Sequence, residues 1–345
     1  MSDGPRFSGD EIRSATYYVL KERGLWPDWQ TFETGRAQIT KWGEDHLTDL
    51  RKSLGNSVWR DGVRAMRMPV ASADLVRVLG TGKLLTEFTL APLGVSDRSL
   101  ARVARLGALS NLIVALYDHC FDNSPDGHRV IVRSMLRVGQ LPRANRFIRR
   151  FIGPADQRLM VGLVHLYYKE LERLAQHHPA GRSVVRITRR AIIRMYEAEV
   201  LTAPSGKPVP EAVLRRKSAL PFVVMGLPGW LAATASPELF RTHLMWLYRL
   251  GAYFGRVDDI VDIESDRHSG ACNGFDLWLE RRGARQSPGA AAEEIASQAE
   301  HVLGMWRKMA DSSGIADHSI SNALGIVTCS WFGGIGWRPS PLHVA

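Results

Sequence analysis

Cysteine is scarce in this chain, and its spacing excludes two common structural devices. The three cysteines, Cys120, Cys272 and Cys329, are odd in number and form no Cys-x-x-Cys pair. An odd number of widely spaced cysteines argues against a disulfide framework, and the missing pair argues against a structural zinc site. We therefore expect reduced thiols.

Long uninterrupted apolar runs are also missing. The longest apolar stretches, such as 220–231, are interrupted by proline and glycine and fall short of the roughly 20 apolar residues that span a bilayer. The first residues show no basic region followed by an apolar run, so they do not resemble a secretion signal. We expect no transmembrane helix and a cytoplasmic location.

The composition is that of a folded soluble protein with a surplus of positive charge. Hydrophobic residues make up 45% and charged residues 23% of the 345 positions, which is ordinary for a globular protein. The formal net charge of +10 calls for an anionic partner. Nucleic acid, an acidic membrane surface and a phosphate-bearing substrate all fit, and charge alone does not choose among them.

Apolar residues recur at helical spacing through most of the chain, while the alternation typical of strands is hard to find. The fold is therefore predicted to be all-α, with about ten helices in one large bundle. The expected helices are 10–23, 31–64, 71–87, 96–121, 127–138, 156–177, 183–200, 211–232, 236–265, 289–311 and 315–332. The segment 267–288 is the longest irregular candidate, and long loops in such positions are often functional lids.

No linker, repeat of fixed period or low-complexity tract divides the chain. The breaks between expected helices are short turns rich in proline, glycine and asparagine. We therefore expect a single domain over 1–345, with N-terminal helices in 1–70, a central core in 71–280 and C-terminal helices in 281–345.

Two aspartates stand at the end of an apolar helix. Asp118 and Asp122 are four residues apart, which places them on one helical face. Two like charges at that spacing repel, and carboxylates at a helix C-terminus are disfavoured by the helix dipole. A solvated helix end and a ligand site both remain open for this pair.

A second acidic cluster ends a later apolar helix. Asp258, Asp262 and Asp266 form a ladder at spacing four, with Asp259 and Glu264 beside it. Such a ladder costs helix stability unless cations neutralise it, and carboxylate oxygens are the ligands that Mg²⁺ prefers when it also binds substrate phosphates. We therefore predict a metal site here. An EF-hand is excluded, because its alternating acidic loop is absent.

A basic helix start lies between the two acidic clusters. Arg215, Arg216 and Lys217 precede an apolar run that the Gly-Leu-Pro-Gly sequence at 226–229 must kink or break. Cations beside apolar surface suit an anionic head group on an apolar tail. An ordinary basic helix start above a core face explains the same residues.

The order and spacing of these three features resemble the class I isoprenoid synthases, which include trans-prenyl diphosphate synthases and class I terpene synthases. The resemblance covers roughly residues 80–280. Asp118 and Asp122 match the first and last positions of one DDxxD motif, Lys217-Ser218 resembles a Lys-Thr pair, and Asp258-Asp259-Ile260-Val261-Asp262 forms a complete second DDxxD. The family fold is a helical bundle around an apolar cavity.

The resemblance also implies a site and a chemistry. Several Mg²⁺ ions would bind together with a prenyl diphosphate, held by Asp118, Asp122, Asp258, Asp259 and Asp262. Lys217 would act with these catalytic carboxylates and bind the diphosphate, with Arg267 assisting. Aromatic residues that would line the cavity and face a carbocation include Tyr117, Phe121, Phe222, Trp230, Tyr253 and Trp331.

The chain departs from the prenyl synthase pattern at several positions. His119 stands where a second aspartate is typical, and no Arg-Arg pair follows the first motif. Gly255 replaces a glutamine before the second motif, and Ala271 replaces a lysine after it. In chain-elongating enzymes such groups hold two diphosphates, so their loss favours an enzyme that handles a single one.

The favoured interpretation is therefore a terpene synthase that ionises farnesyl, geranylgeranyl or a longer prenyl diphosphate and releases a terpene plus diphosphate. The alternative is a prenyltransferase of the trans-prenyl diphosphate synthase kind. A head-to-head synthase is less expected, because it would show DxxxD at both motifs. Synthases of this kind are often dimers, so a homodimer is an expectation.

A non-catalytic basic helical protein that binds nucleic acid or acidic membrane is a second alternative. Arg186, Arg189, Arg190 and Arg194 share one side of an expected helix, but no aromatic interleaving or nucleic-acid motif accompanies them. We expect neither a nucleic-acid partner nor stable membrane insertion. A degenerate family member without activity is a further alternative, motivated by His119.

Overall fold

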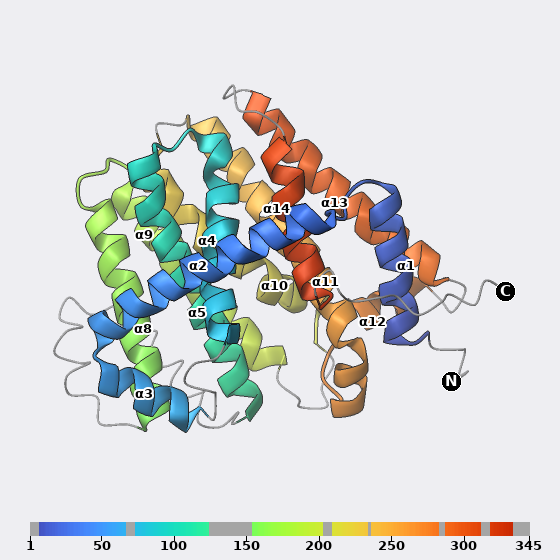
Figure 1. Cartoon of the computed structure of the whole chain (residues 1–345), viewed down its shortest axis with the longest axis horizontal. Helices are drawn as coiled ribbons and strands as arrows, with labels where there is room; N and C mark the ends of the chain where they lie inside the picture. The colour runs from blue at the N-terminus through green and yellow to red at the C-terminus, as the bar shows by residue number, and fades with distance from the viewer. Residues whose placement is uncertain are drawn as a thin grey trace. The chain divides into compact units, whose positions relative to one another are not determined.

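The structure is a computed structural model of the chain. It describes residues 7–66, 73–123, 154–202, 209–233, 236–282, 287–311 and 318–333. These ranges contain twelve α-helices, two short 3₁₀ helices and no strand, so the predicted all-α fold class is confirmed (Figure 1). The expected helix 127–138 lies outside the described residues.

The chain forms two compact units, each built from separate stretches of sequence. The first unit comprises Met1–Arg36, Leu201–Phe222 and Arg241–Ala345, and the second comprises Ala37–Val200 and Val223–Phe240. A single domain over 1–345, with the subdivisions 1–70, 71–280 and 281–345, stays a prediction.

The first unit pairs the beginning of the chain with its last third. Its helices are α1 (Gly9–Glu22), most of α10 (Glu211–Gly226), most of α11 (Pro237–Ser269), α12 (Gly274–Arg282), α13 (Pro288–Asp311) and α14 (His318–Trp331). The first of these helices packs against α13, as the blue and orange ribbons of Figure 1 show. At its end, the guanidinium of Arg23 pairs with Glu293 and Glu300 on α13.

Helix α12 lies inside the segment 267–288, which was expected to be an irregular loop, so that prediction was wrong for its central part. The helix is capped by Asn273, whose Oδ1 accepts hydrogen bonds from the backbone N–H groups of Phe275 and Asp276, both at 3.0 Å. An asparagine cap satisfies backbone donors that a helix start otherwise leaves unpaired. Such a cap lets even a nine-residue helix with little apolar periodicity begin at a defined position.

The second unit contains the middle of the chain. Its elements are most of α2 (Trp29–Leu54), α3 (Asn56–Ala65), α4 (Ala73–Leu90), η1 (Ala91–Leu93), α5 (Asp97–Asn123), α8 (Ala155–Ala175), most of α9 (Gly181–Thr202) and η2 (Leu227–Leu231). The α5 helix packs against α4 and α8, and α3 packs against α8. The side of α5 that faces the core carries Val103, Leu112 and Leu116, which are fully buried.

Two breaks in helical structure can be compared with the predictions, one missed and one expected. The expected single helix 31–64 is divided at Gly55, whose φ of 88° lies in the left-handed region that favours glycine. Apolar periodicity continues across this position, which is why the break was missed. The Gly-Leu-Pro-Gly sequence does end a helix, because α10 stops at Gly226 and a 3₁₀ turn follows.

One stretch, Arg98–Tyr117 in α5, is long and apolar enough to cross a membrane by length and composition. Of this stretch, 56% is buried inside the structure. Core helices of soluble proteins pass the same test, so the stretch is weak support for a membrane span.

A leucine-lined cavity of about 680 Å³ lies within the second unit between α2, α4, α5 and α8. His46 lines it, is only 9% exposed, and has an Nε2 atom with no hydrogen-bond partner in the part of the chain that the structure describes. Burial, together with the positive charges of Arg105 and Lys83, lowers the pKa of His46. The neutral imidazole is therefore the stable form in the folded protein.

Replacing His46 with glutamine is expected to flatten the acid side of the stability profile. Because the pKa of His46 is lower in the folded state, the unfolded chain takes up a proton at a higher pH than the folded protein does. The contribution of neutral His46 to the free energy of unfolding is therefore fully present above about pH 6.5 and is lost as the pH drops below it. One proton limits this effect to about 1.4 kcal/mol per pH unit. Urea unfolding of both proteins between pH 7.5 and 5 measures it, and parallel profiles would contradict the assignment.

Candidate active site

The end of α11 carries three of the predicted metal ligands. Val257, Ile260 and Ile263 are fully buried, which fixes one side of this helix against the core. Asp258 and Asp262 are exposed. Residues four apart lie on the same helical face, so these two carboxylates form an acidic pair on the part of the helix that the core leaves open.

A tryptophan from another helix holds the first of these carboxylates. The indole Nε1 of Trp331, in α14, donates a hydrogen bond to Oδ1 of Asp258 at 2.9 Å. The Trp331 ring stacks on Phe254 with centroids 5.2 Å apart, and Phe254 stacks on Phe222, also at 5.2 Å and with nearly parallel planes. The row of three rings begins at the acidic pair and ends in the core, where Phe222 is buried.

Asp259 has a different environment from its neighbours. Its side chain is only one quarter exposed, and its Oδ2 lies 3.9 Å from the Arg256 guanidinium. Burial raises the pKa of Asp259 to about 7, while the charge of Arg256 and a hydrogen bond from the Gly274 backbone oppose this shift. Protonated and ionised forms of this carboxyl group are therefore both populated near neutral pH, and a bound cation would favour the ionised form.

Arg256 connects the acidic end of α11 to two other helices. Its Nη1 donates a hydrogen bond to the backbone oxygen of Gly274 at the start of α12, and its Nη2 lies 3.9 Å from Glu211 at the start of α10. Burial lowers the pKa of Arg256, but an arginine stays charged in proteins. Arg256 was not among the predicted site residues. The one feature of the sequence that could have identified it is its position within an otherwise apolar part of a helix.

Asn273 fastens the loop that follows α11. The side chain is 4% exposed, and its Nδ2 donates to the backbone oxygen of Asp259 at 2.7 Å and to Oδ2 of Asp266 at 2.8 Å. Asp266, the third aspartate of the predicted series at spacing four, is therefore hydrogen-bonded to the loop after α11. Because Asn273 also caps α12, one side chain connects both helices.

The hydrogen bonds of Arg267 point to a role different from the predicted one. Its Nε and Nη2 donate to the two carboxylate oxygens of Asp276 at 2.9 and 2.7 Å, and its Nη1 donates to the backbone oxygen of Phe7 at 2.8 Å. The neighbouring Glu264 accepts a hydrogen bond from the backbone N–H of Gly9 at 2.6 Å. These contacts join the start of α1 to the end of α11, so substrate binding by Arg267 stays a prediction that competes with them.

A cavity of about 700 Å³ opens beside Asp259 within the first unit. Helices α10, α11, α12 and α13 line it, and its polar residues include Glu211, Arg215, Arg256, Glu294 and His301. A wall of mixed charge fits a polar ligand or water better than a hydrocarbon chain.

The predicted Lys217-Ser218 pair lies where α10 meets α11. Lys217 is half-buried, and Ser218 faces Gly255 on α11. A Cβ at Gly255 would stand 2.2 Å from the Cβ of Ser218, which is closer than real atoms approach. The glutamine that prenyl synthases carry at the position of Gly255 therefore has no space here, so this departure from the family pattern is coupled to close helix packing.

The first aspartate motif belongs to the second unit. Asp118 and Asp122 lie on the last turns of α5, and their side chains, like that of Phe121, lie outside the described residues. Tyr117 precedes them, is buried, and has its ring 4.4 Å from that of Tyr196. The meeting of the two aspartate motifs across one cavity stays a prediction.

The residues at the end of α11 fit a magnesium ion in their chemistry. Within the described ranges no three His, Cys, Asp or Glu side chains converge to form a ready-made metal site. Mg²⁺ does not require such a cluster of three side chains, because it commonly binds through one or two carboxylates and takes its remaining ligands from water and substrate phosphates. Asp258 and Asp262 offer such carboxylates at an exposed position.

A solved structure of a geranylgeranyl pyrophosphate synthetase shares this fold. A geranylgeranyl pyrophosphate synthetase from the archaeon Geoglobus acetivorans matches 86% of this chain and 98% of its own with 12% identity and a TM-score of 0.55. An FPP/GFPP synthase from Zymomonas mobilis is a looser match, with 16% identity, coverage of 83% of this chain and 99% of its own, and a TM-score of 0.45. A geranyltransferase from Legionella pneumophila is similarly loose, with 14% identity, coverage of 88% and 97%, and a TM-score of 0.48. No protein-family model and no curated protein matches the chain.

The first of these likenesses confirms the predicted fold. The chain has the all-α fold of the isoprenoid synthases, as it is found in this geranylgeranyl pyrophosphate synthetase. An identity of 12% supports the fold alone, so activity has to be argued from the residues of this chain.

Proposed function

We propose that this chain is a Mg²⁺-dependent prenyltransferase, an enzyme that ionises an allylic prenyl diphosphate and transfers the prenyl group to an acceptor. The observation that carries the proposal is the exposed pair Asp258 and Asp262 beside the row of aromatic rings that begins at Trp331. The fold shared with a geranylgeranyl pyrophosphate synthetase moves our preference from terpene synthase, favoured by the sequence, to prenyltransferase.

The reaction begins with cleavage of the bond between the allylic carbon and the diphosphate oxygen. The electron pair leaves with the diphosphate, and the allylic fragment becomes a cation. Bound Mg²⁺ would neutralise the negative charge that develops on the departing diphosphate. An acceptor double bond then attacks the cation, and a proton is lost to restore the double bond.

The residues of this chain would serve the two charged fragments separately. Asp258, Asp259 and Asp262, with Asp118 and Asp122, would hold the metal ions, and Lys217 would contact the diphosphate. The open face of Trp331 would stabilise the allylic cation by cation–π attraction of about 2 kcal/mol where water is excluded, while the buried rings of Phe254 and Phe222 would support it from behind. The hydrogen bond from Trp331 to Asp258 would link metal binding to stabilisation of the cation, since it keeps the Trp331 ring beside a carboxylate that would bind Mg²⁺.

A terpene synthase is the second candidate, and a specific observation favours it. The close contact between Gly255 and Ser218 leaves no space for the glutamine of chain-elongating enzymes, and Ala271 supplies no cation where those enzymes have a lysine. Fewer groups for a second diphosphate suit a reaction in which the cation attacks a double bond of its own chain. Both candidates share the ionisation step and differ in the acceptor.

Incubation of the purified chain with Mg²⁺ and a single prenyl diphosphate distinguishes the two. We expect geranyl, farnesyl or geranylgeranyl diphosphate to give a longer prenyl diphosphate when isopentenyl diphosphate is added, and little product without it. Mass spectrometry of the extract and an assay for released diphosphate provide the readout, and a parallel incubation with EDTA provides the metal-free control.

Each remaining result has a definite meaning. A hydrocarbon or terpene alcohol formed from one substrate alone establishes the second candidate. Absence of diphosphate release from every substrate, with and without acceptor, contradicts both and leaves a non-catalytic member of the fold. The cytoplasmic location and the homodimer stay predictions alongside this proposal.

A further inference from the structure

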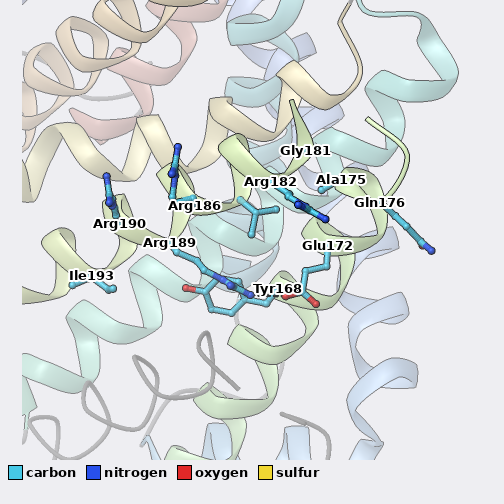
Figure 2. Close-up of a pocket in the computed structure, with 11 residues that line it drawn as sticks. Tyr168, Glu172, Ala175, Gln176, Gly181, Arg182, Arg186, Arg189, Arg190 and Ile193 are labelled. Atoms are coloured by element: carbon cyan, nitrogen blue, oxygen red, sulfur yellow. Dashed lines mark hydrogen bonds and ion pairs between the residues drawn. The ribbon is translucent and has the colours of Figure 1, made fainter. Parts of the chain in front are cut away.

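A strongly basic groove, distinct from the two cavities described above, lies between α8 and α9 (Figure 2). Its volume is about 630 Å³. We call it the arginine groove; its lining includes Tyr168, Glu172, Arg182, Arg186, Arg189, Arg190 and Ile193. Both helices belong to the second unit, and none of the aspartates or the lysine of the candidate active site lines it.

One arginine of the groove is already neutralised. Arg189 forms an ion pair with Glu172, and its guanidinium carbon lies 5.5 Å from the centre of the Tyr168 ring. Figure 2 shows Arg189 extended across this ring beside Glu172. Glu172 is the only carboxylate among the lining residues, so it offsets a single positive charge.

The other arginines keep their charge. Arg182, Arg186 and Arg190 follow one another at intervals of four along α9 and are exposed, and Arg194 continues the series beyond the groove. Within the described part of the chain no carboxylate pairs with any of them. Like charges four apart destabilise a helix, so the series is unfavourable unless an anion compensates it.

The directions of the side chains and the floor of the groove indicate what kind of anion fits. Figure 2 shows Arg186 and Arg190 extending from α9 in the same direction, so that one anionic group can contact both. Between the arginines the floor is apolar, with Val185, Ile193 and Ala175. The guanidinium fork matches phosphate oxygens with two parallel hydrogen bonds, and apolar surface beside it accepts a hydrocarbon portion.

We propose that the arginine groove is a binding site for the phosphate group of an amphiphilic anion, independent of Mg²⁺. A phosphate monoester carries about 1.5 to 2 negative charges at pH 7 and three acceptor oxygens, which suits the neighbouring guanidinium groups of Arg186 and Arg190, while Arg182 adds to the positive charge of the groove. Two sources present this chemistry, a free mono- or diphosphate ester and the head group of an anionic phospholipid. The proposal does not depend on the activity assigned to the aspartate motif.

Binding in the presence of EDTA separates this groove from any metal-dependent site. The groove variant is Arg182→Gln/Arg186→Gln/Arg190→Gln, and the control variant is Arg64→Gln/Arg98→Gln/Arg158→Gln. The control removes the same charge from three arginines outside the groove, which are also exposed and form no ion pair with the described residues. Circular dichroism and thermal unfolding check that both variants are folded.

Three probes are titrated at fixed ionic strength: inorganic diphosphate, phosphatidylcholine vesicles with and without phosphatidic acid, and a short DNA duplex. We expect the wild type and the control to bind diphosphate or the acidic vesicles, and the groove variant to bind at least tenfold more weakly. Loss of diphosphate binding identifies a soluble ester as the source, and loss of vesicle binding identifies a lipid head group.

The proposal is overturned by any of three results. The first is that the wild type binds neither phosphate probe. The second is that the groove and control variants lose affinity equally. The third is that DNA is the only probe whose binding the groove variant loses. The second result would reduce the groove to a part of the general positive charge. The third would assign the series on α9 to nucleic acid, in which case affinity should fall steeply with salt.

Discussion

Replacing Asp258 with alanine is expected to lower kcat/KM for diphosphate release by about a thousandfold or more. A bound metal ion contributes several kcal/mol to stabilising the leaving group, and each 1.36 kcal/mol corresponds to a factor of ten. The carboxylate is exposed, and its hydrogen-bond partner Trp331 can bond to water in its absence, so stability should change by less than about 0.5 kcal/mol. Single-turnover kinetics and urea unfolding measure the two effects.

Glu22→Ala provides the matched control, because Glu22 is an exposed helical carboxylate at the end of α1. Raising the Mg²⁺ concentration should partly restore Asp258→Ala, since the loss lies in holding the metal ions, and should leave the control unaffected. A variant that keeps more than a tenth of the wild-type kcat/KM would remove the second aspartate motif from the mechanism.

The contact between α10 and α11 makes a second large effect testable. In a helix interior, Gly→Ala usually stabilises by about 0.5–1 kcal/mol, and Gly304→Ala on α13 should do so because a Cβ there meets nothing within 4 Å. Gly255→Ala should instead destabilise by about 1–3 kcal/mol, since its Cβ would collide with that of Ser218. A shift of α10 also moves Lys217, and a misplacement of about 1 Å in a catalytic group can lower activity by about a hundredfold.

A compensating substitution identifies the cause. Ser218→Gly removes the atoms that obstruct the new Cβ, so the double variant Gly255→Ala/Ser218→Gly should recover most of the lost stability and activity. Denaturant midpoints and steady-state rates for the four proteins of this cycle give the coupling energy directly. Equal effects of Gly255→Ala and Gly304→Ala would mean that the two helices separate without cost.

Helical periodicity was sufficient to predict the fold class, because most helices bury a continuous apolar stripe. It failed where local backbone geometry outweighs periodicity. The apolar pattern passes through Gly55 without interruption, although its positive φ ends α2 there. Helix α12 was missed for the opposite reason, since its nine residues carry little periodicity and begin where Asn273 supplies a cap.

The candidate site was predictable only where its chemistry is local in sequence. Asp258, Asp259 and Asp262 could be recognised from their spacing alone. The side chains that surround them come from tertiary contacts: Trp331 lies 73 positions after the carboxylate it contacts, and Asn273 lies 14 after its backbone acceptor. No pattern within a helix encodes such pairs. For Arg267 the predicted role rested on its position after the motif, and the structure shows ion-pair partners that this position does not reveal.

The pairing of α1 with α13 determines the order in which the chain can assemble during synthesis. The first helix leaves the ribosome long before its partner, because about 270 residues separate them, a delay on the order of tens of seconds. Through this interval Ile12, Ala15 and Leu20, which are buried in the final structure, have no α13 to cover them. The second unit is complete by residue 240 and can fold while the first still waits. A nascent chain of this protein therefore presents an uncovered apolar helix until α13 is made, which makes α1 a natural target for a ribosome-associated chaperone.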